Sequence, residues 1–83
     1  MKHATSDTLD QLEELLNELG ELAYLTEKKR GIFYIKSRAF LHFHEDPGGL
    51  FADVRFNAEF ERFPVNTKTE RRLLLDKIAT TCA

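Results

Sequence analysis

The sequence contains a single cysteine, Cys82, so the chain cannot form an internal disulfide bond. Small secreted domains usually depend on several disulfides, and we do not expect this protein to be one of them. No apolar run approaches the roughly 18 residues of a membrane-spanning helix, and the stretch MKHATSDT lacks the apolar core of a secretion signal. We therefore expect a protein that does not bind membranes and resides in the reducing cytoplasm.

The sequence also lacks an excess of positive charge. Its 12 Lys and Arg residues are outnumbered by 14 Asp and Glu residues, which gives a formal net charge of −2. Sequence-independent binding of nucleic acid depends on clustered positive charge, so we do not expect nucleic acid to bind over the surface in general, and only a local patch stays open. The bases that could converge in such a patch are Lys28, Lys29, Arg30, Lys36, Arg38, Arg71 and Arg72.

The residues that are present are typical of one small folded domain covering residues 1–83. The chain is 42% hydrophobic and 31% charged, a balance that favours a folded core over disorder. A chain of this length has room for only one core. Its seven phenylalanines predict that aromatic packing dominates that core.

Helical patterns lie at both ends of the chain. Leucines recur at intervals of three and four between positions 9 and 19, which predicts an amphipathic helix over residues 7–19 with Ser6 or Asp7 as its N-cap. Towards the other end, Thr67 and Glu70 form the S/T-x-x-E pattern of a capping box. This pattern predicts a second helix over residues 68–81.

The region between the helices has the pattern of β-strands. Three short segments are rich in β-branched and aromatic side chains, namely residues 31–36, 39–46 and 50–56. Ser37-Arg38 and Asp46-Pro47-Gly48-Gly49 are the turns between them. The sequence therefore predicts an α+β fold in the order α-β-β-β-α, in which two helices flank an antiparallel meander of three to four strands. Whether residues 22–27 and 58–63 are strands stays open.

Alternation along the strands divides their side chains between two faces. A four-residue turn sets His42 opposite Asp53, and a shift of two residues would set His44 opposite Asp53 instead. Either register places both histidines on one face, which we call the histidine face. With the first hairpin closed at Ser37-Arg38, the predicted histidine face comprises Phe33, Ile35, Phe40, His42, His44, Phe51, Asp53 and Arg55.

Large apolar side chains mixed with polar ones are typical of a surface that contacts a partner. We therefore expect a non-enzymatic binding or assembly module that uses the histidine face. A homodimer is the simplest version, because two-fold self-association buries the same surface on both copies. Nucleic-acid binding through the bases named above is a less favoured alternative.

A metal-dependent or acid/base enzyme at His42, His44 and Asp53 is the last alternative. Two imidazoles and a carboxylate are the ligand set of an open zinc or iron site, and a His42–Asp53 dyad could transfer protons. However, the H-x-H spacing is common by chance, and Arg55 is expected to place positive charge beside the site. Cross-strand pairing of His with Asp explains these residues more simply, and we expect it to raise the pKa of at least one histidine. No cofactor, metal or catalytic residue is therefore predicted.

The stretch FYIKSRAFLHFHEDPGGLFADVRF resembles the MmcQ/YjbR-like group of short, mostly uncharacterised bacterial α+β proteins. The resemblance covers about residues 30–57 and includes the segment from Lys36 to Phe40, which is similar to a Lys/Arg-x-Phe opening of a strand. A small luciferase-associated domain with an H-x-H-like strand is a more distant likeness. The resemblance implies an antiparallel sheet flanked by helices and, for some relatives, a DNA-binding role. This chain is shorter and acidic, and no nucleic-acid-contacting motif of that group carries over to it.

Overall fold

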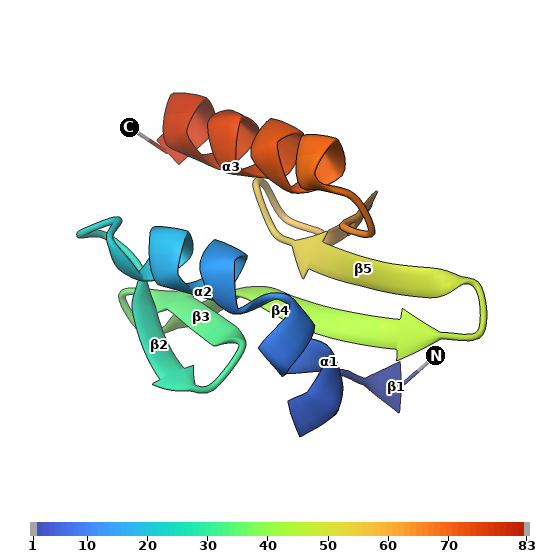
Figure 1. Ribbon diagram of the computed structural model, residues 1–83. Helices are drawn as coiled ribbons and strands as arrows, with labels where there is room; N and C mark the ends of the chain where they lie inside the picture. The colour runs from blue at the N-terminus through green and yellow to red at the C-terminus, as the bar shows by residue number, and fades with distance from the viewer. Residues whose placement is uncertain (1, 83) are drawn as a thin grey trace.

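The computed structural model describes residues 2–82 and has an α+β fold (Figure 1), so the predicted fold class is confirmed. Its elements follow the order β1 (Lys2–His3), α1 (Ser6–Gln11), α2 (Glu13–Gly20), β2 (Thr26–Lys29), β3 (Ile32–Ile35), β4 (Arg38–Asp46), β5 (Gly49–Val54), β6 (Glu61–Pro64) and α3 (Lys68–Cys82). The strand count is higher than predicted, because β2 and β6 overlap the two regions that the sequence left open and β1 adds a further short strand. Among residues 2–82, no helix is long and apolar enough to cross a membrane.

The strands form one antiparallel sheet in the order β2-β3-β4-β5-β6. The long strand β4 is its centre, with β5 along one edge. The other edge of β4 is shared, because β3 pairs with residues 38–42 and the two-residue strand β1 pairs with residues 44–45. The N-terminal strand is thereby placed beside the two histidines of β4.

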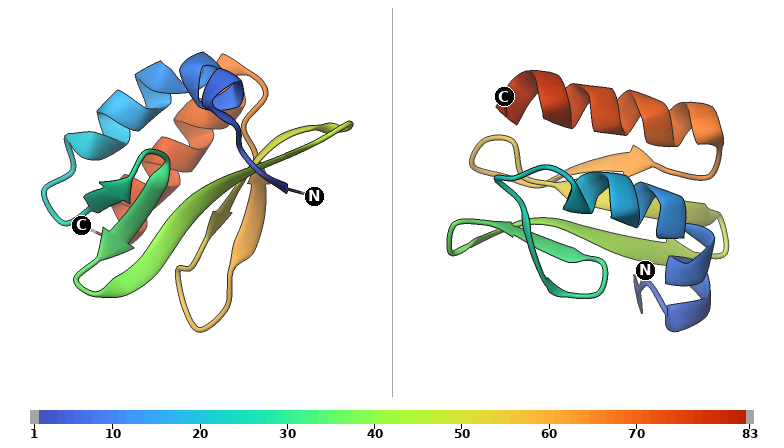
Figure 2. Two further views of the ribbon diagram at one scale, coloured as in Figure 1. Left: turned by 90° about the horizontal axis from the view of Figure 1, so that it is seen from below. Right: turned by 60° about the vertical axis from the view of Figure 1, so that its left-hand side comes forward.

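The helices lie on one face of the sheet, with α2 and α3 side by side (Figure 2). The core fills the space between the helices and the sheet. Its largest fully buried side chains come from all parts of the chain and are Leu12, Leu19, Phe33, Leu41, Val54, Val65 and Ile78. The opposite face of the sheet, which carries His42 and His44, has no helix on it within the described part of the chain.

The predicted helices are found with small changes at their ends. The N-terminal helix is split at Leu12 into α1 and α2, and its N-cap is Thr5 instead of Ser6 or Asp7. The capping box of α3 is formed as predicted, since the Glu70 backbone N–H donates to Thr67 Oγ1 and the Thr67 N–H donates to Glu70 Oε1, both at 3.1 Å.

The β4–β5 hairpin has the predicted register, with His42 opposite Asp53. Two local features favour its turn. The Gly48 N–H donates to Asp46 Oδ1 at 2.7 Å, and Gly49 has a φ of +142°, a conformation that residues with a Cβ rarely adopt. This local chemistry explains why the turn could be identified from the sequence.

The β3–β4 hairpin corrects the prediction for Phe33 and Phe40. Its turn is Lys36-Ser37, with Lys36 at φ 57°, and this change alone would keep the same residues on each face. The register then shifts by one residue, because Phe40 forms a bulge that has no partner in β3. A one-residue shift moves side chains to the opposite face, so Phe33 pairs with Leu41 and both are fully buried.

The bulge also turns the Phe40 side chain into the core, where it is only 4% exposed. Its ring packs edge-on against Phe56, with centroids 5.9 Å apart. Ile35 likewise packs against the core. Three of the eight residues predicted for the histidine face, Phe33, Ile35 and Phe40, therefore belong to the core side of the molecule.

Candidate functional site

Two rows of directly paired residues cross the histidine face. The first row consists of Ile32, His42, Asp53 and Arg62. The second row consists of His3, His44, Phe51 and Pro64. Since β1, β3, β4, β5 and β6 all contribute, the site depends on the whole sheet and not on a single hairpin.

Asp53 occupies the centre of the first row and is only 7% exposed. Arg62 binds its carboxylate with both Nε and Nη2, at 2.8 and 2.9 Å. These hydrogen bonds are the main reason why the pKa of Asp53 lies below its usual value, and the positive charge of Arg62 adds to the effect against the opposing influence of burial. Asp53 is therefore a charged carboxylate at neutral pH.

The carboxylate of Asp53 contacts His44 and not the directly opposite His42. Its Oδ2 lies 2.9 Å from Nδ1 of His44, a diagonal contact between the two rows. The distance is that of an ion pair, but Nδ1 of His44 forms no hydrogen bond of acceptable geometry in the described residues. Nδ1 of His42 is also buried and has no hydrogen-bond partner in residues 2–82. The proton-transfer dyad proposed for His42 and Asp53 is therefore not formed.

The histidines form a cluster of rings on β1 and β4. The rings of His42 and His44 are 4.6 Å apart between centroids and meet edge-on, and His3 lies 4.7 Å from His44. The pKa of His42 is lowered, first by burial and then by the neighbouring His44, and these effects outweigh the attraction of Asp53. The expectation that cross-strand pairing raises a histidine pKa is wrong for His42, because burial and the neighbouring His44 lower its pKa by more than Asp53 raises it.

Arg55 lies at the border of the histidine face. Its Nη2 donates to the carbonyl oxygen of Ala39, and its guanidinium lies 4.8 Å from the ring centroid of Phe60. The Phe60 ring in turn packs against His42 at 4.9 Å. The residues of the predicted site that share the histidine face are thus His42, His44, Phe51 and Asp53, with Arg55 beside them.

Two polar residues of the site, His3 and Arg62, were missing from the prediction. Arg62 alternates with Phe63, which packs against the core, and this period-two pattern could have identified β6. A strand of two residues such as β1 leaves no comparable pattern, so the position of His3 followed from no feature of the sequence.

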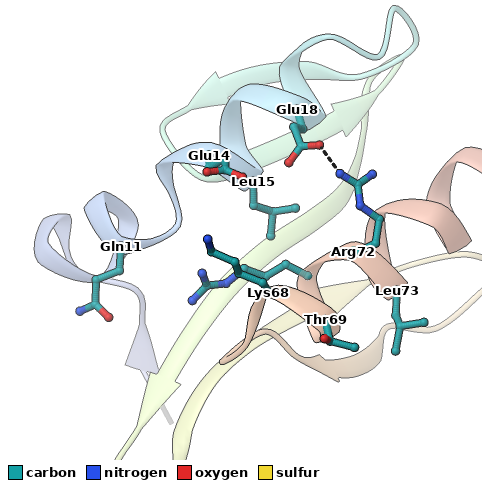
Figure 3. Close-up of a pocket in the computed structure, with 9 residues that line it drawn as sticks. Gln11, Glu14, Leu15, Glu18, Lys68, Thr69, Arg72 and Leu73 are labelled. Carbon is teal, nitrogen blue, oxygen red and sulfur yellow. Dashed lines mark hydrogen bonds and ion pairs between the residues drawn. The ribbon is translucent and has the colours of Figure 1, made fainter.

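A groove of about 580 Å³ lies on the other side of the molecule, between the N-terminal helices and α3 (Figure 3). Charged side chains line it, but several of them pair within the chain. Arg72 Nη2 lies 2.9 Å from Glu18 Oε2, and the guanidinium of Arg71 donates to the carbonyl oxygens of Val65 and Asn66. These contacts join α3 to its neighbours, which gives the groove a structural role.

Two further bases considered for nucleic-acid binding, Arg30 and Lys28, also have partners within the chain. Arg30 forms an ion pair with Asp10 at 2.7 Å, and Lys28 lies 4.8 Å from the ring centroid of Tyr34. Arg30, Lys28, Arg71 and Arg72 therefore all contribute to contacts within the protein.

Fold and site together define an α+β protein with helices on one face of an antiparallel sheet and a histidine-rich polar cluster on the other. No protein-family model matches the chain, and no curated protein or solved structure is significantly similar to it. The resemblance to the MmcQ/YjbR-like group is accordingly not supported by any match, and the function has to be argued from the site.

Proposed function

We propose that this protein is a small non-enzymatic binding module and that a second copy of the same chain binds to its histidine face. The observation that supports this most is the absence of a helix on this face within residues 2–82, while the other face of the sheet carries all three helices. A sheet face that bears large apolar side chains is usually covered by some other layer.

The composition of the histidine face suits a copy of itself. Phe60 is 39% exposed and lies against His42, and Phe51 is half-buried in the second row. Arg62 and Asp53 neutralise each other within one chain, so this pair brings no unpaired charge to a contact with a second copy. A reducing cytoplasmic location is part of the proposal, because the chain has no disulfide that would stabilise it elsewhere.

The size of the face is adequate for a dimer. A stable interface buries about 800 Å² on each partner, which is about 15% of the 5199 Å² that this protein exposes. The molecule measures 32 × 24 × 23 Å, so one of its broad faces offers an area of that order.

Sedimentation velocity over a range of protein concentrations tests the proposal. We expect a reversible monomer–dimer equilibrium in the wild-type protein. Phe60→Ser should weaken it at least about tenfold, which corresponds to about 1.4 kcal/mol, because an aromatic side chain leaves the interface.

Leu73→Ser is the matched control, since Leu73 is an apolar side chain with 65% exposure on α3, away from the histidine face. We expect this variant to dimerise like the wild type. A protein that stays monomeric at all concentrations, or a dimer that Leu73→Ser weakens as much as Phe60→Ser does, would contradict the proposal.

A further inference from the structure

All three histidines of the chain lie together on the histidine face, although they are far apart in the sequence. His42 and His44 are two positions apart on β4, so their side chains point to the same face. His3 pairs directly with His44 through the β1–β4 ladder, and its ring lies 5.7 Å from His42 between centroids. One ring nitrogen from each histidine lies within 4.8 Å of those from the other two.

We infer that His3, His42 and His44 form a binding site for a divalent transition-metal ion of the zinc type, with a further coordination position open to water or a ligand. Three imidazoles are a ligand set that Zn²⁺ accepts. Tetrahedral coordination at about 2.1 Å sets the nitrogens about 3.4 Å apart, so the rings have to approach one another by at most about 1.4 Å. Small rotations of exposed or half-buried rings achieve this.

The surroundings of the rings favour metal binding. Nδ1 of His42 is buried without a hydrogen-bond partner in the described residues, and such an orphan nitrogen is unusual unless it has a role. The carboxylate of Asp53 lies 2.9 Å from Nδ1 of His44, close enough to orient this ring once the ring rotates to bind the ion through Nε2.

The positive charges near the site are already neutralised or directed elsewhere. Both nitrogens that Arg62 turns towards the cluster are bound to Asp53. The guanidinium of Arg55 is held by Ala39 and Phe60. We therefore do not expect Arg55 to repel a cation from this site, because its guanidinium does not lie between the rings.

The position of His3 is fixed by contacts that follow it in the chain. The Ala4 N–H donates to the carbonyl oxygen of Phe43 at 3.1 Å. The Thr5 N–H donates to Glu45 Oε1 at 2.7 Å, and the Thr8 hydroxyl donates to the same oxygen at 2.8 Å. These bonds hold β1 against β4, which makes the third ligand part of the fold.

The inference does not depend on self-association, because one chain supplies all three ligands. It is tested by calorimetric titration of the full chain, without a polyhistidine tag, with Zn²⁺ alone. We expect one ion per chain with a Kd below about 10 μM at about pH 7.5 and binding at least tenfold weaker at about pH 5.5, because imidazoles must lose their protons to bind. The visible spectrum of Co²⁺ bound in the same site reports nitrogen coordination directly.

His3→Gln is the decisive variant, since His3 is exposed and its replacement leaves the core untouched. We expect His3→Gln, His42→Gln and His44→Gln each to weaken Zn²⁺ binding at least tenfold while circular dichroism shows an intact fold. Leu73→Ser, which alters an exposed apolar side chain on α3 away from the three rings, should bind Zn²⁺ like the wild type. The inference is wrong if the wild type binds no Zn²⁺ at about 100 μM, or if His3→Gln binds it unchanged.

Discussion

Asp53 is a buried carboxylate on a sheet face without a helix, and its two neighbours explain why it stays charged. Arg62 binds both of its oxygens and His44 lies against one of them. Because the pKa of Asp53 is lower in the folded than in the unfolded protein, its stabilising effect is complete above the ordinary carboxyl pKa of about 3.9. The effect is lost as the pH falls through the lower pKa of the folded state.

Asp53→Asn should therefore destabilise the metal-free protein at neutral pH, and the difference from the wild type should shrink below about pH 4. Urea unfolding between about pH 7 and pH 2 measures this difference. Asp76→Asn is the control, because the Asp76 side chain is 64% exposed and its contact with Arg72 is long, at 3.7 Å. We expect it to have little effect at any pH. A pH-independent effect of Asp53→Asn would show that the carboxylate acts through packing and not through its charge.

Contacts between residues that are close in the sequence could be predicted, whereas contacts that depend on distant strands could not. Thr67 and Glu70 are three positions apart and bond to each other, so their capping box was visible in the sequence. Asp53 and His42 are joined by a hairpin with a strong turn, and their register was predicted correctly. Arg62 and His3 reach the site through β6 and β1, whose pairing depends on the assembled sheet.

At the scale of the elements, one bulge decided which side chains form the core. The turn of the β4–β5 hairpin was identified and that of the β3–β4 hairpin was predicted one residue too late, at Ser37-Arg38. The faces changed because Phe40 is an extra residue in β4, and nothing in the alternation of residues 39–46 reveals it. A bulge is favoured here because it buries two neighbouring side chains, Phe40 and Leu41, on the same side. The strand pattern alone therefore could not separate the core phenylalanines from the histidines.

The position of His3, the third histidine of the cluster, depends on the attachment of β1 and α1 to β4. Glu45 Oε1 accepts from the Thr8 hydroxyl, which belongs to a residue only 5% exposed. Thr8→Val keeps the shape of the side chain and removes this hydrogen bond, so we expect a loss of about 1.5 kcal/mol in the free energy of unfolding.

Amide hydrogen exchange shows which part of the protein is destabilised in Thr8→Val. The Ala4 N–H, bonded to Phe43, should exchange faster in Thr8→Val, while the Arg55 N–H, bonded to the carbonyl oxygen of Phe40, should exchange at the wild-type rate when corrected for global stability. Equal acceleration at both amides would mean that β1 does not open separately from the sheet.

At the scale of the whole molecule, the layers place two phenylalanines of the same sheet in different environments. Phe33 is fully buried beneath the helices, whereas Phe51 lies half-buried on the histidine face beside His44. A domain of this size is stabilised by only about 4 to 12 kcal/mol in total, so the loss of one core aromatic ring is a large fraction of its stability.

The same substitution at the two positions therefore distinguishes the faces. Phe33→Ala should cost about 3 to 5 kcal/mol in the free energy of unfolding, because it leaves a cavity in the core, and Phe51→Ala about 1 kcal/mol in dilute solution, because water reaches the site it vacates. Urea unfolding measures both, and Phe33→Leu provides a milder variant if Phe33→Ala does not fold. Equal losses at the two positions would mean that the histidine face is packed as tightly as the core, and a second copy of the chain would then have no open surface to bind.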